Sequence, residues 1–168
     1  MVHITEFTAD LIRNNKLKLD PSRNDKYKVT FHDSCNTARG MGLLEEPRYI
    51  IRNVMNPANF HEMPENTIRE QTYCCGSGSG LNTDELMEMR MRGGFPRANA
   101  VRHVADKHDV NMLATICAID KATLSALMQY WVPQVDIIGV HELLGNALVV
   151  DGEPERAQNL RGEPLKED

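Results

Sequence analysis

The sequence predicts an α/β domain with a mainly parallel sheet flanked by helices. Segments typical of strands alternate with segments typical of helices, which favours parallel strands joined by helical crossovers. The chain has 168 residues, enough for one domain with its own core, and its 41% hydrophobic and 26% charged residues are typical of a globular protein. We expect residues 1–150 to form this domain and the polar residues 151–168, which include two prolines, to form a flexible tail.

The first half of the chain predicts two helices and two strands. In order, these are a helix over residues 4–14, a strand over 27–32, a helix over 42–55 and a short strand over 58–62. Apolar residues recur at helical spacing in the first helix, and Tyr27, Val29 and Phe31 show the alternation of a strand. Pro47 fits the second helix only near its start, because proline has no N–H to donate inside a helix.

The second half continues the alternation. Its predicted elements are helices over 82–92, 96–108, 120–131 and 141–150 and strands over 110–116 and 134–140. Asn82 or Thr83 is suited to cap the first of these helices, and Gly93 and Gly94 should end it. Pro96 then suits the first turn of a new helix.

Composition argues against several kinds of partner. The net charge of −5 is weak evidence against nucleic acid, because phosphate binding needs a basic surface. No apolar run approaches the roughly 20 residues that a membrane-spanning helix needs, and no secretory signal is visible. We therefore expect a cytoplasmic protein that has no membrane span of its own and whose cysteines stay reduced.

The four cysteines are placed so that they can meet. Cys35 follows the first predicted strand, Cys117 follows the third, and the adjacent Cys74 and Cys75 follow the second after about ten residues. Ligands gather at the carboxyl ends of parallel strands, so we expect these sulfurs at one edge of the sheet. In a reducing compartment, clustered cysteines indicate a metal site or catalysis rather than disulfides.

The adjacent cysteines favour a cluster over a single ion. Thiolates select zinc, copper(I) or iron–sulfur clusters, but zinc sites usually pair cysteines separated by two to four residues, a spacing that the sequence lacks. Gly76, Gly78 and Gly80 would let the backbone approach a cluster and donate N–H groups to sulfur. A metal-free redox pair of Cys74 and Cys75 is the alternative, although the usual motif places two residues between the thiols.

Three segments, HDSCNTAR, YCCGSGSGL and ICAID, resemble the cysteine-rich CCG domain of heterodisulfide reductases. The resemblance covers about residues 27–150, and it is strongest to the iron–sulfur subunit of the membrane complex associated with dissimilatory sulfite reductase. It implies a [4Fe–4S] cluster, either cubane or of the non-cubane form that family members build on five cysteines. The implied metal ligands are Cys35, Cys74, Cys75 and Cys117. The family's fifth cysteine falls on Asp120, which is then an oxygen ligand or a non-ligand beside the cofactor.

The same resemblance implies a function. The domain would transfer electrons in a heterodisulfide reductase-like enzyme that reduces a disulfide or trisulfide of a small thiol or a sulfur-carrier protein in dissimilatory sulfur metabolism. Related full-length subunits also carry a ferredoxin-like domain, so we expect a fragment or a subunit that needs partners, among them a quinone-oxidising membrane subunit. The cluster can be absent from a sample prepared in air, because exposed clusters are oxygen-sensitive. The alternative is a cluster-free module that docks a sulfur-carrier partner.

Residues near the cysteines have a functional and a structural interpretation. Cys74 and Cys75 would act in catalysis together with His32, which could donate a proton or hydrogen bond to the cleaved sulfur, as could Asp33. The alternative is that His32 ends a strand and bonds only to the backbone. Arg39 could hold an anionic substrate, although an ordinary surface ion pair is the favoured interpretation.

Two further His–Glu pairs follow predicted strands. For His61 and Glu62 we favour a solvated loop. Glu142 should complement the positive end of the last helix, while His141 is a weaker candidate for a proton role.

Overall fold

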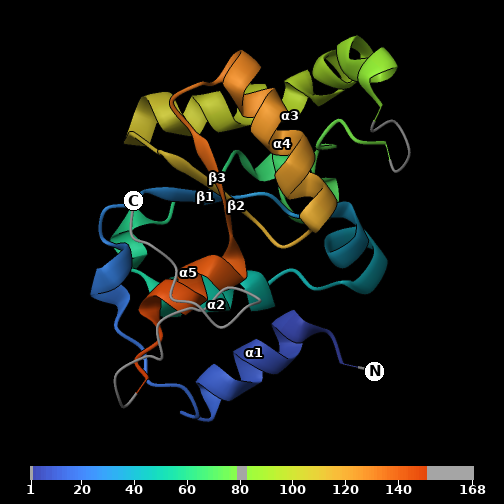
Figure 1. Ribbon diagram of the computed structural model, residues 1–168. Helices are drawn as coiled ribbons and strands as arrows, with labels where there is room; N and C mark the ends of the chain where they lie inside the picture. Colours follow the sequence, from blue (N-terminus) through green and yellow to red (C-terminus); the bar gives the residue numbers. More distant parts are fainter. Residues whose placement is uncertain (1, 79–82, 151–168) are drawn as a thin grey trace, which may run out of the picture.

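The computed structural model describes residues 2–78 and 83–150 and contains three parallel strands between two layers of helices (Figure 1). The main elements are α1 (Ile4–Arg13), β1 (Val29–Phe31), α2 (Glu46–Val54), α3 (Met87–His108), β2 (Met112–Thr115), α4 (Ala118–Trp131), β3 (Asp136–Gly139) and α5 (Val140–Ala147). The predicted α/β class is therefore confirmed. The expected tail, residues 151–168, lies outside the described residues and stays a prediction.

The sheet has the strand order β1-β2-β3, and both pairings are parallel. In this register Phe31, Ala114 and Ile138 lie side by side on one face, whereas Leu113 and its neighbour Ile137 lie on the other. Because all three strands run the same way, their carboxyl ends meet at one edge of the sheet.

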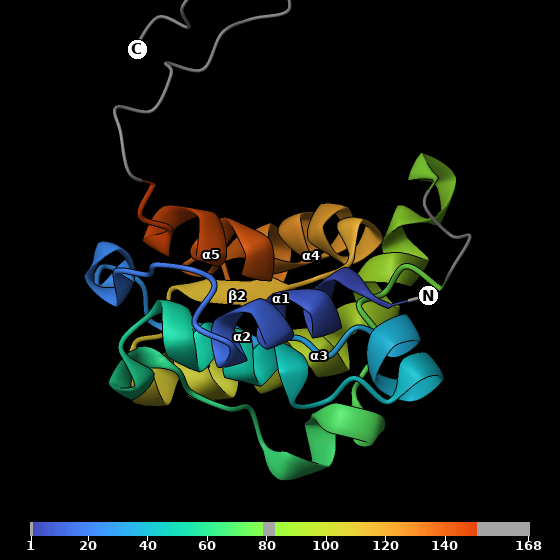
Figure 2. The same cartoon turned by 90° about the horizontal axis from the view of Figure 1, so that it is seen from below.

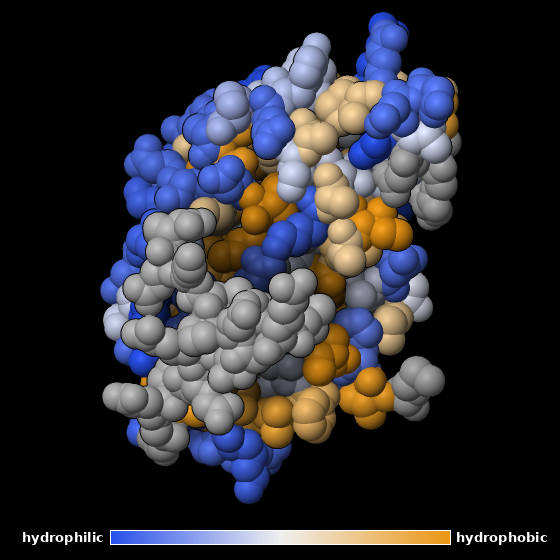
Figure 3. All heavy atoms as spheres, viewed as in Figure 1, coloured by the Kyte–Doolittle hydropathy of each residue, from blue (hydrophilic) through white to orange (hydrophobic). Residues whose placement is uncertain are grey.

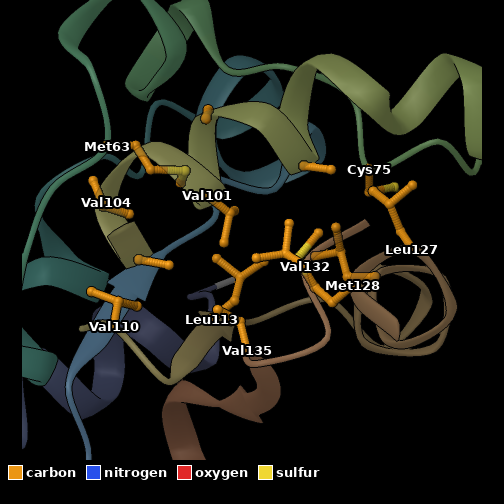
Figure 4. Packing of buried hydrophobic residues seen from close by; sticks show 14 of the residues in the cluster. Met63, Cys75, Val101, Val104, Val110, Leu113, Leu127, Met128, Val132 and Val135 are labelled. Carbon is orange, nitrogen blue, oxygen red and sulfur yellow. The ribbon is translucent and has the colours of Figure 1, made fainter. Parts of the chain in front are cut away.

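Each face of the sheet is covered by its own helices (Figures 1 and 2). Helices α1, α2 and α5 enclose a core with Phe31, Ala114 and Ile138, and α3 and α4 enclose a second core around Leu113 (Figure 4). Cys75 belongs to the second core, so the adjacent cysteines enter the molecule on the side of α3 and α4.

Helix α1 packs against α2 with one face only. Ala9 and Ile12 are buried, whereas Ile4 and Phe7 are more than half exposed. Figure 3 shows apolar side chains at the surface near the N-terminus. No helix in residues 2–78 and 83–150 is both long and apolar enough to cross a membrane.

The predicted break in the helix at Gly93 and Gly94 is wrong, because α3 continues through Pro96 without interruption. A Cβ at Gly94 would lie 2.7 Å from Leu127 of α4 and 3.2 Å from the carbonyl oxygen of Cys75. The missing side chain thus lets α4 and the Cys75 segment approach α3 closely, and this packing compensates the low helix propensity of glycine and proline.

Two other predictions need correction in the first half. Residues 58–62 form no strand, and only Phe60 makes an isolated parallel bridge with Val29. The helix expected over 42–55 begins at Glu46, because Gly42 adopts a left-handed backbone with φ of +69°. A π-helical turn, Asn36–Gly40, which periodicity did not predict, follows Cys35.

The start of α3 also differs from the prediction. Thr83 precedes a short 3-10 turn, Asp84–Leu86, and makes no side-chain capping bond. Asn82, the other candidate cap, lies outside the described residues. The other helices and strands confirm the predicted types, with ends that differ by a few residues.

A buried ion pair holds the segment after α2 against the end of β1. Both guanidinium Nη atoms of Arg48 donate to the carboxylate of Asp33 at 2.7 Å, and neither side chain is exposed. The Nε of Arg48 donates to Glu62 at 2.6 Å, and the backbone N–H of Arg69 donates to Asp33 at 2.8 Å. Side-chain bonds thereby replace the strand that the sequence predicted here.

The adjacent residues Gly93 and Gly94 allow a test of the close packing of α3. We expect Gly94→Ala to destabilise the protein by about 1–3 kcal/mol, because the new methyl group overlaps Leu127. The matched control is Gly93→Ala, where a Cβ meets nothing within 4 Å, and it should stabilise by up to about 1 kcal/mol through helix propensity. Urea unfolding measures both values, and equal effects would contradict the packing argument.

The buried ion pair should dominate stability. Asp33→Ala should cost about 3–5 kcal/mol, because it leaves the Arg48 guanidinium buried beside an empty space. The control is Asp10→Ala, which removes an exposed pair with Arg13 and should cost no more than about 1 kcal/mol. Thermal and urea unfolding provide the measurement, and a small loss for Asp33→Ala would show that Glu62 alone neutralises Arg48.

Candidate functional site

All four cysteines line one pocket of about 120 Å³ at the carboxyl ends of the strands. Cys35 lies four residues after the end of β1, and Cys117 lies between β2 and α4 as the N-cap residue of α4. Cys74 and Cys75 come from the loop that precedes α3. The remaining lining residues are Asn36, Ser77, Gly78, Ile119 and Asp120. The structure therefore brings together the three chain segments that the sequence singled out.

The four sulfurs differ in exposure. Cys35 and Cys74 are exposed, Cys117 is half-buried and Cys75 is buried, and all four are free thiols. The backbone N–H of Gly76 donates to the sulfur of Cys74 at 3.3 Å. Burial raises the pKa of the Cys75 thiol well above its ordinary value, with the nearby Asp120 carboxylate adding to the rise. The pocket is thus open on the side of Cys35 and Cys74 and closed on the side of Cys75.

The glycines after the adjacent cysteines are required by the backbone. Gly76 has φ of +94° and Gly78 has φ of +56°, conformations that other residues rarely adopt. A Cβ at Gly76 would lie 2.7 Å from the carbonyl oxygen of Arg90 on α3. The loop can therefore lie directly on the helix only with glycine at this position. Gly80 lies outside the described residues.

The donor set fits an iron–sulfur cluster better than a single metal ion. Four thiols surround the pocket, and thiolates are the usual ligands of such clusters. Within residues 2–78 and 83–150, no three His, Cys, Asp or Glu side chains are grouped closely enough to hold one ion. The amino end of α4, which carries Cys117, adds a positive dipole beside the sulfurs.

Asp120 lies in the first turn of α4 and lines the same pocket. Its side chain is buried, and Oδ2 lies 3.5 Å from Nε2 of His32 and accepts a hydrogen bond from Thr115 at 3.3 Å. Burial opposes ionisation, but the hydrogen bonds from His32, Ser34 and Cys75 outweigh it and lower the pKa of Asp120 to about 2. Asp120, onto which the resemblance places a fifth cysteine, is therefore a buried carboxylate that lines the same pocket as Cys75.

His32 does not line the pocket itself. It is 1% exposed, and burial lowers its pKa, although the hydrogen bond to Asp120 opposes this effect. Its Nδ1 has no partner among the described residues. Asp33 is also absent from the pocket lining, and Arg48 binds both of its carboxylate oxygens.

Arg39 binds the chain rather than a free anion. Its Nε donates to the carbonyl of Glu70 at 2.7 Å, and its Nη2 donates to the carbonyl of Thr72 at 2.8 Å. The Thr72 hydroxyl donates in turn to the carbonyl of Asp33 at 2.8 Å. Arg39 therefore ties the segment that leads into Cys74 to the end of β1, and the favoured interpretation as a surface ion pair is replaced by bonds to backbone carbonyls.

The two His–Glu pairs have structural partners. His61 stacks on His108 with 4.3 Å between the ring centroids, and Glu62 is the second carboxylate of the Arg48 network, so this segment is not a solvated loop. His141 lies 3.2 Å from the Thr8 hydroxyl of α1. Glu142 accepts from the N–H of Gly139, which confirms its role at the start of α5.

Sequence reasoning missed one charged residue that holds the segment leading into the site. Arg97 on α3 is fully buried, and it donates to the carbonyl of Thr67 and the hydroxyl of Thr72, just before the adjacent cysteines. The available signal was periodicity, because Arg97 shares the buried face of the helix with Gly94 and Val101.

Comparisons with known proteins agree with this geometry. The model of the CCG family, described as "Cysteine-rich domain", matches residues 29–123. The Hdr-like menaquinol oxidoreductase iron-sulfur subunit 2 of Archaeoglobus fulgidus is 56% identical over 169 residues, which cover 98% of this chain and 30% of that protein.

Two further relatives belong to other reductases. One component of the dihydromethanophenazine:CoB–CoM heterodisulfide reductase of Methanosarcina acetivorans is 33% identical over 129 residues, 74% of this chain and 28% of that protein. One component of the fumarate reductase (CoM/CoB) of Methanothermobacter marburgensis is 31% identical over 148 residues, with 88% of this chain and 27% of that protein covered. No solved structure matches.

The chain spans about 30% of the length of the Archaeoglobus fulgidus protein and of a second relative. Both proteins are named as Hdr-like menaquinol oxidoreductase subunits. The names of the relatives confirm the resemblance to heterodisulfide reductases, whereas closeness to the subunit associated with sulfite reductase holds only approximately. The match over residues 29–123 takes in more than half of the chain and all four cysteines. The chain therefore belongs to the family of the CCG cysteine-rich domain.

Proposed function

We propose that this domain holds one [4Fe–4S] cluster and transfers electrons within a heterodisulfide reductase-like oxidoreductase. The observation that carries the proposal is the single pocket lined by all four cysteines. The names of the relatives support it, because they are iron–sulfur subunits or heterodisulfide reductase subunits. Cys35, Cys74, Cys75 and Cys117 are the proposed ligands.

The chain's own groups fit this role. When bound, the cluster supplies one-electron transfer and an iron site at which a substrate sulfur can bind. The N–H of Gly76 and the amino end of α4 stabilise negative charge on the sulfurs. Cys35 and Cys74 are the exposed sulfurs, so a substrate reaches the pocket from their side.

The proposed substrate is a disulfide or trisulfide of a small thiol or of a sulfur-carrier protein, in dissimilatory sulfur metabolism. Reduction of a disulfide consumes two electrons and two protons and yields two thiols. The electrons would come from a quinone-oxidising membrane subunit, a role suggested by the menaquinol oxidoreductase among the relatives. The domain would then work on the cytoplasmic side and associate with the membrane through that partner.

Asp120 and His32 are proposed to position the buried cysteine. The carboxylate of Asp120 faces Cys75, and His32 supports it from the interior. His32 therefore acts through Asp120 instead of touching the substrate. Because Oδ2 of Asp120 already contacts His32 and Thr115 in the interior, we propose four sulfur ligands with Asp120 as a neighbour of the cluster rather than a ligand.

The first test is an iron and sulfide count after anaerobic reconstitution. The expected result is four irons and four sulfides per chain with broad visible absorption, in line with a [4Fe–4S] centre. Serine variants of each cysteine should lose most of the iron, whereas Asn36→Ala, which removes a pocket-lining residue without sulfur, should keep it. A colourless, iron-free wild-type protein would contradict the proposal and favour a cluster-free module that docks a sulfur-carrier partner.

Asp120 provides a second test. Asp120→Asn should keep four irons, because an amide of the same shape leaves the four sulfurs in place. Asp120→Cys restores the family's fifth cysteine and should change the paramagnetic resonance spectrum while the iron count stays constant. Loss of iron in Asp120→Asn, with unchanged circular dichroism, would instead identify the carboxylate as a ligand.

A further inference from the structure

A buried cation lies behind the adjacent cysteines. Arg97 of α3 is 0% exposed, and its Nη2 donates to the carbonyl of Thr67 at 2.7 Å and to the hydroxyl of Thr72 at 2.8 Å. The carbonyl of Tyr73 lies 3.4 Å from the same nitrogen, and Nη1 donates to the sulfur of Met63 at 2.9 Å. The guanidinium thus binds the chain at several points just before it turns into Cys74.

None of these hydrogen-bond partners is charged. The Nε of Arg97 has no hydrogen-bond partner among the described residues, although buried donors are almost always paired. Burial lowers the pKa of Arg97 to about 10, and attraction to Asp33 and Asp120 opposes the fall, so the group is still a cation at neutral pH. A buried charge without a direct counterion is costly and rarely tolerated without a role.

The second fully buried arginine gives the comparison. Arg48 is also 0% exposed, but it forms a two-pronged ion pair with Asp33 and a further pair with Glu62. The fold therefore neutralises one buried guanidinium completely and, among the described residues, leaves the other without a carboxylate in contact. Asp120 is one of the two carboxylates that attract Arg97 through space, and it lines the cysteine pocket.

We propose that Arg97 is the countercharge of the cluster, a positioning residue that holds the segment before Cys74 and stabilises negative charge in the pocket through space. This inference rests on the proposed function, because the charge that it neutralises is that of a cluster with thiolate ligands. Each added electron makes this assembly more negative, so a nearby buried cation stabilises the reduced form more than the oxidised form. Arg97 thereby raises the reduction potential of the site.

The test compares Arg97→Met, Arg97→Lys and Arg102→Met. Methionine keeps the apolar bulk but removes the charge, and lysine keeps the charge but loses the planar fork. Arg102 lies on the same helix, and it donates to the carbonyl of Trp131 at 2.6 Å, away from the cysteine pocket. Arg102→Met therefore controls for the loss of an arginine and one backbone contact on α3.

The first measurement is the reduction potential by anaerobic spectroelectrochemical titration. We expect Arg97→Met to shift the potential to a more negative value, Arg97→Lys to lie near the wild type and Arg102→Met to match it. Equal potentials for Arg97→Met and Arg102→Met, at equal iron content, would overturn the countercharge role. A wild-type protein without iron would overturn the proposed function instead, so the two failures are distinguishable.

The second measurement uses the metal-free, reduced protein. Hydrogen exchange of the backbone amides of residues 72–76, followed by mass spectrometry, should become about tenfold faster in Arg97→Met, as expected when loop opening becomes easier by ~1.4 kcal/mol. The rate should stay unchanged in Arg102→Met, and thermal unfolding confirms that each variant is folded. An unchanged rate in folded Arg97→Met would overturn the positioning role, whether or not a cluster binds.

Discussion

The buried pair between Asp33 and Arg48 is the constraint on which the arrangement of the site depends. It joins the end of β1 to α2, and through Glu62 and the backbone of Arg69 it also holds the irregular segment that precedes the cysteines. This segment has almost no strand pairing of its own, so side-chain bonds to backbone groups must replace a ladder. Without them, the adjacent cysteines would have no defined position above the strand ends.

Two arginines from different elements complete this support. Arg39 binds the carbonyls of Glu70 and Thr72 from the side of the π-helical turn, and Arg97 binds Thr72 and its surroundings from α3. Guanidinium groups suit this work because each presents several donors in a fixed plane. The loop is therefore held by hydrogen bonds before the adjacent cysteines and by close backbone packing after them.

Glycine supplies that close packing. Gly76 lies against the carbonyl of Arg90, and Gly94 lies against both Leu127 and the carbonyl of Cys75. These contacts place Cys75 in the buried core formed by α3 and α4. The arrangement leaves the side of the pocket with Cys75 buried and the side with Cys35 and Cys74 open to solvent. This asymmetry is consistent with the proposed function, in which a substrate reaches the exposed sulfurs from solvent.

Local patterns were sufficient for most of the helices and strands. Period and capping signals identified the alternation of helices and strands, and the positions of Cys35 and Cys117 after parallel strands predicted that their sulfurs would approach each other. The same signals failed at Gly93–Pro96 and at 58–62. In both places, contacts with a distant segment outweigh local propensity. At Gly93–Pro96 these contacts are with Leu127 and Cys75, and at 58–62 the contact is the ion pair of Glu62 with Arg48.

By itself, the sequence determined the fold class, the four cysteines and the glycines that follow two of them, because these depend on residue type and on neighbours along the chain. Only the tertiary structure decided that Asp120 lies between His32 and the cysteine pocket and that Asp33 belongs to Arg48. It also decided that Arg97 is buried and bound to uncharged groups in the segment before Cys74. The physical reason is that the energy of a buried charge is set by the partners that folding brings within a few ångströms, and sequence spacing does not encode those distances.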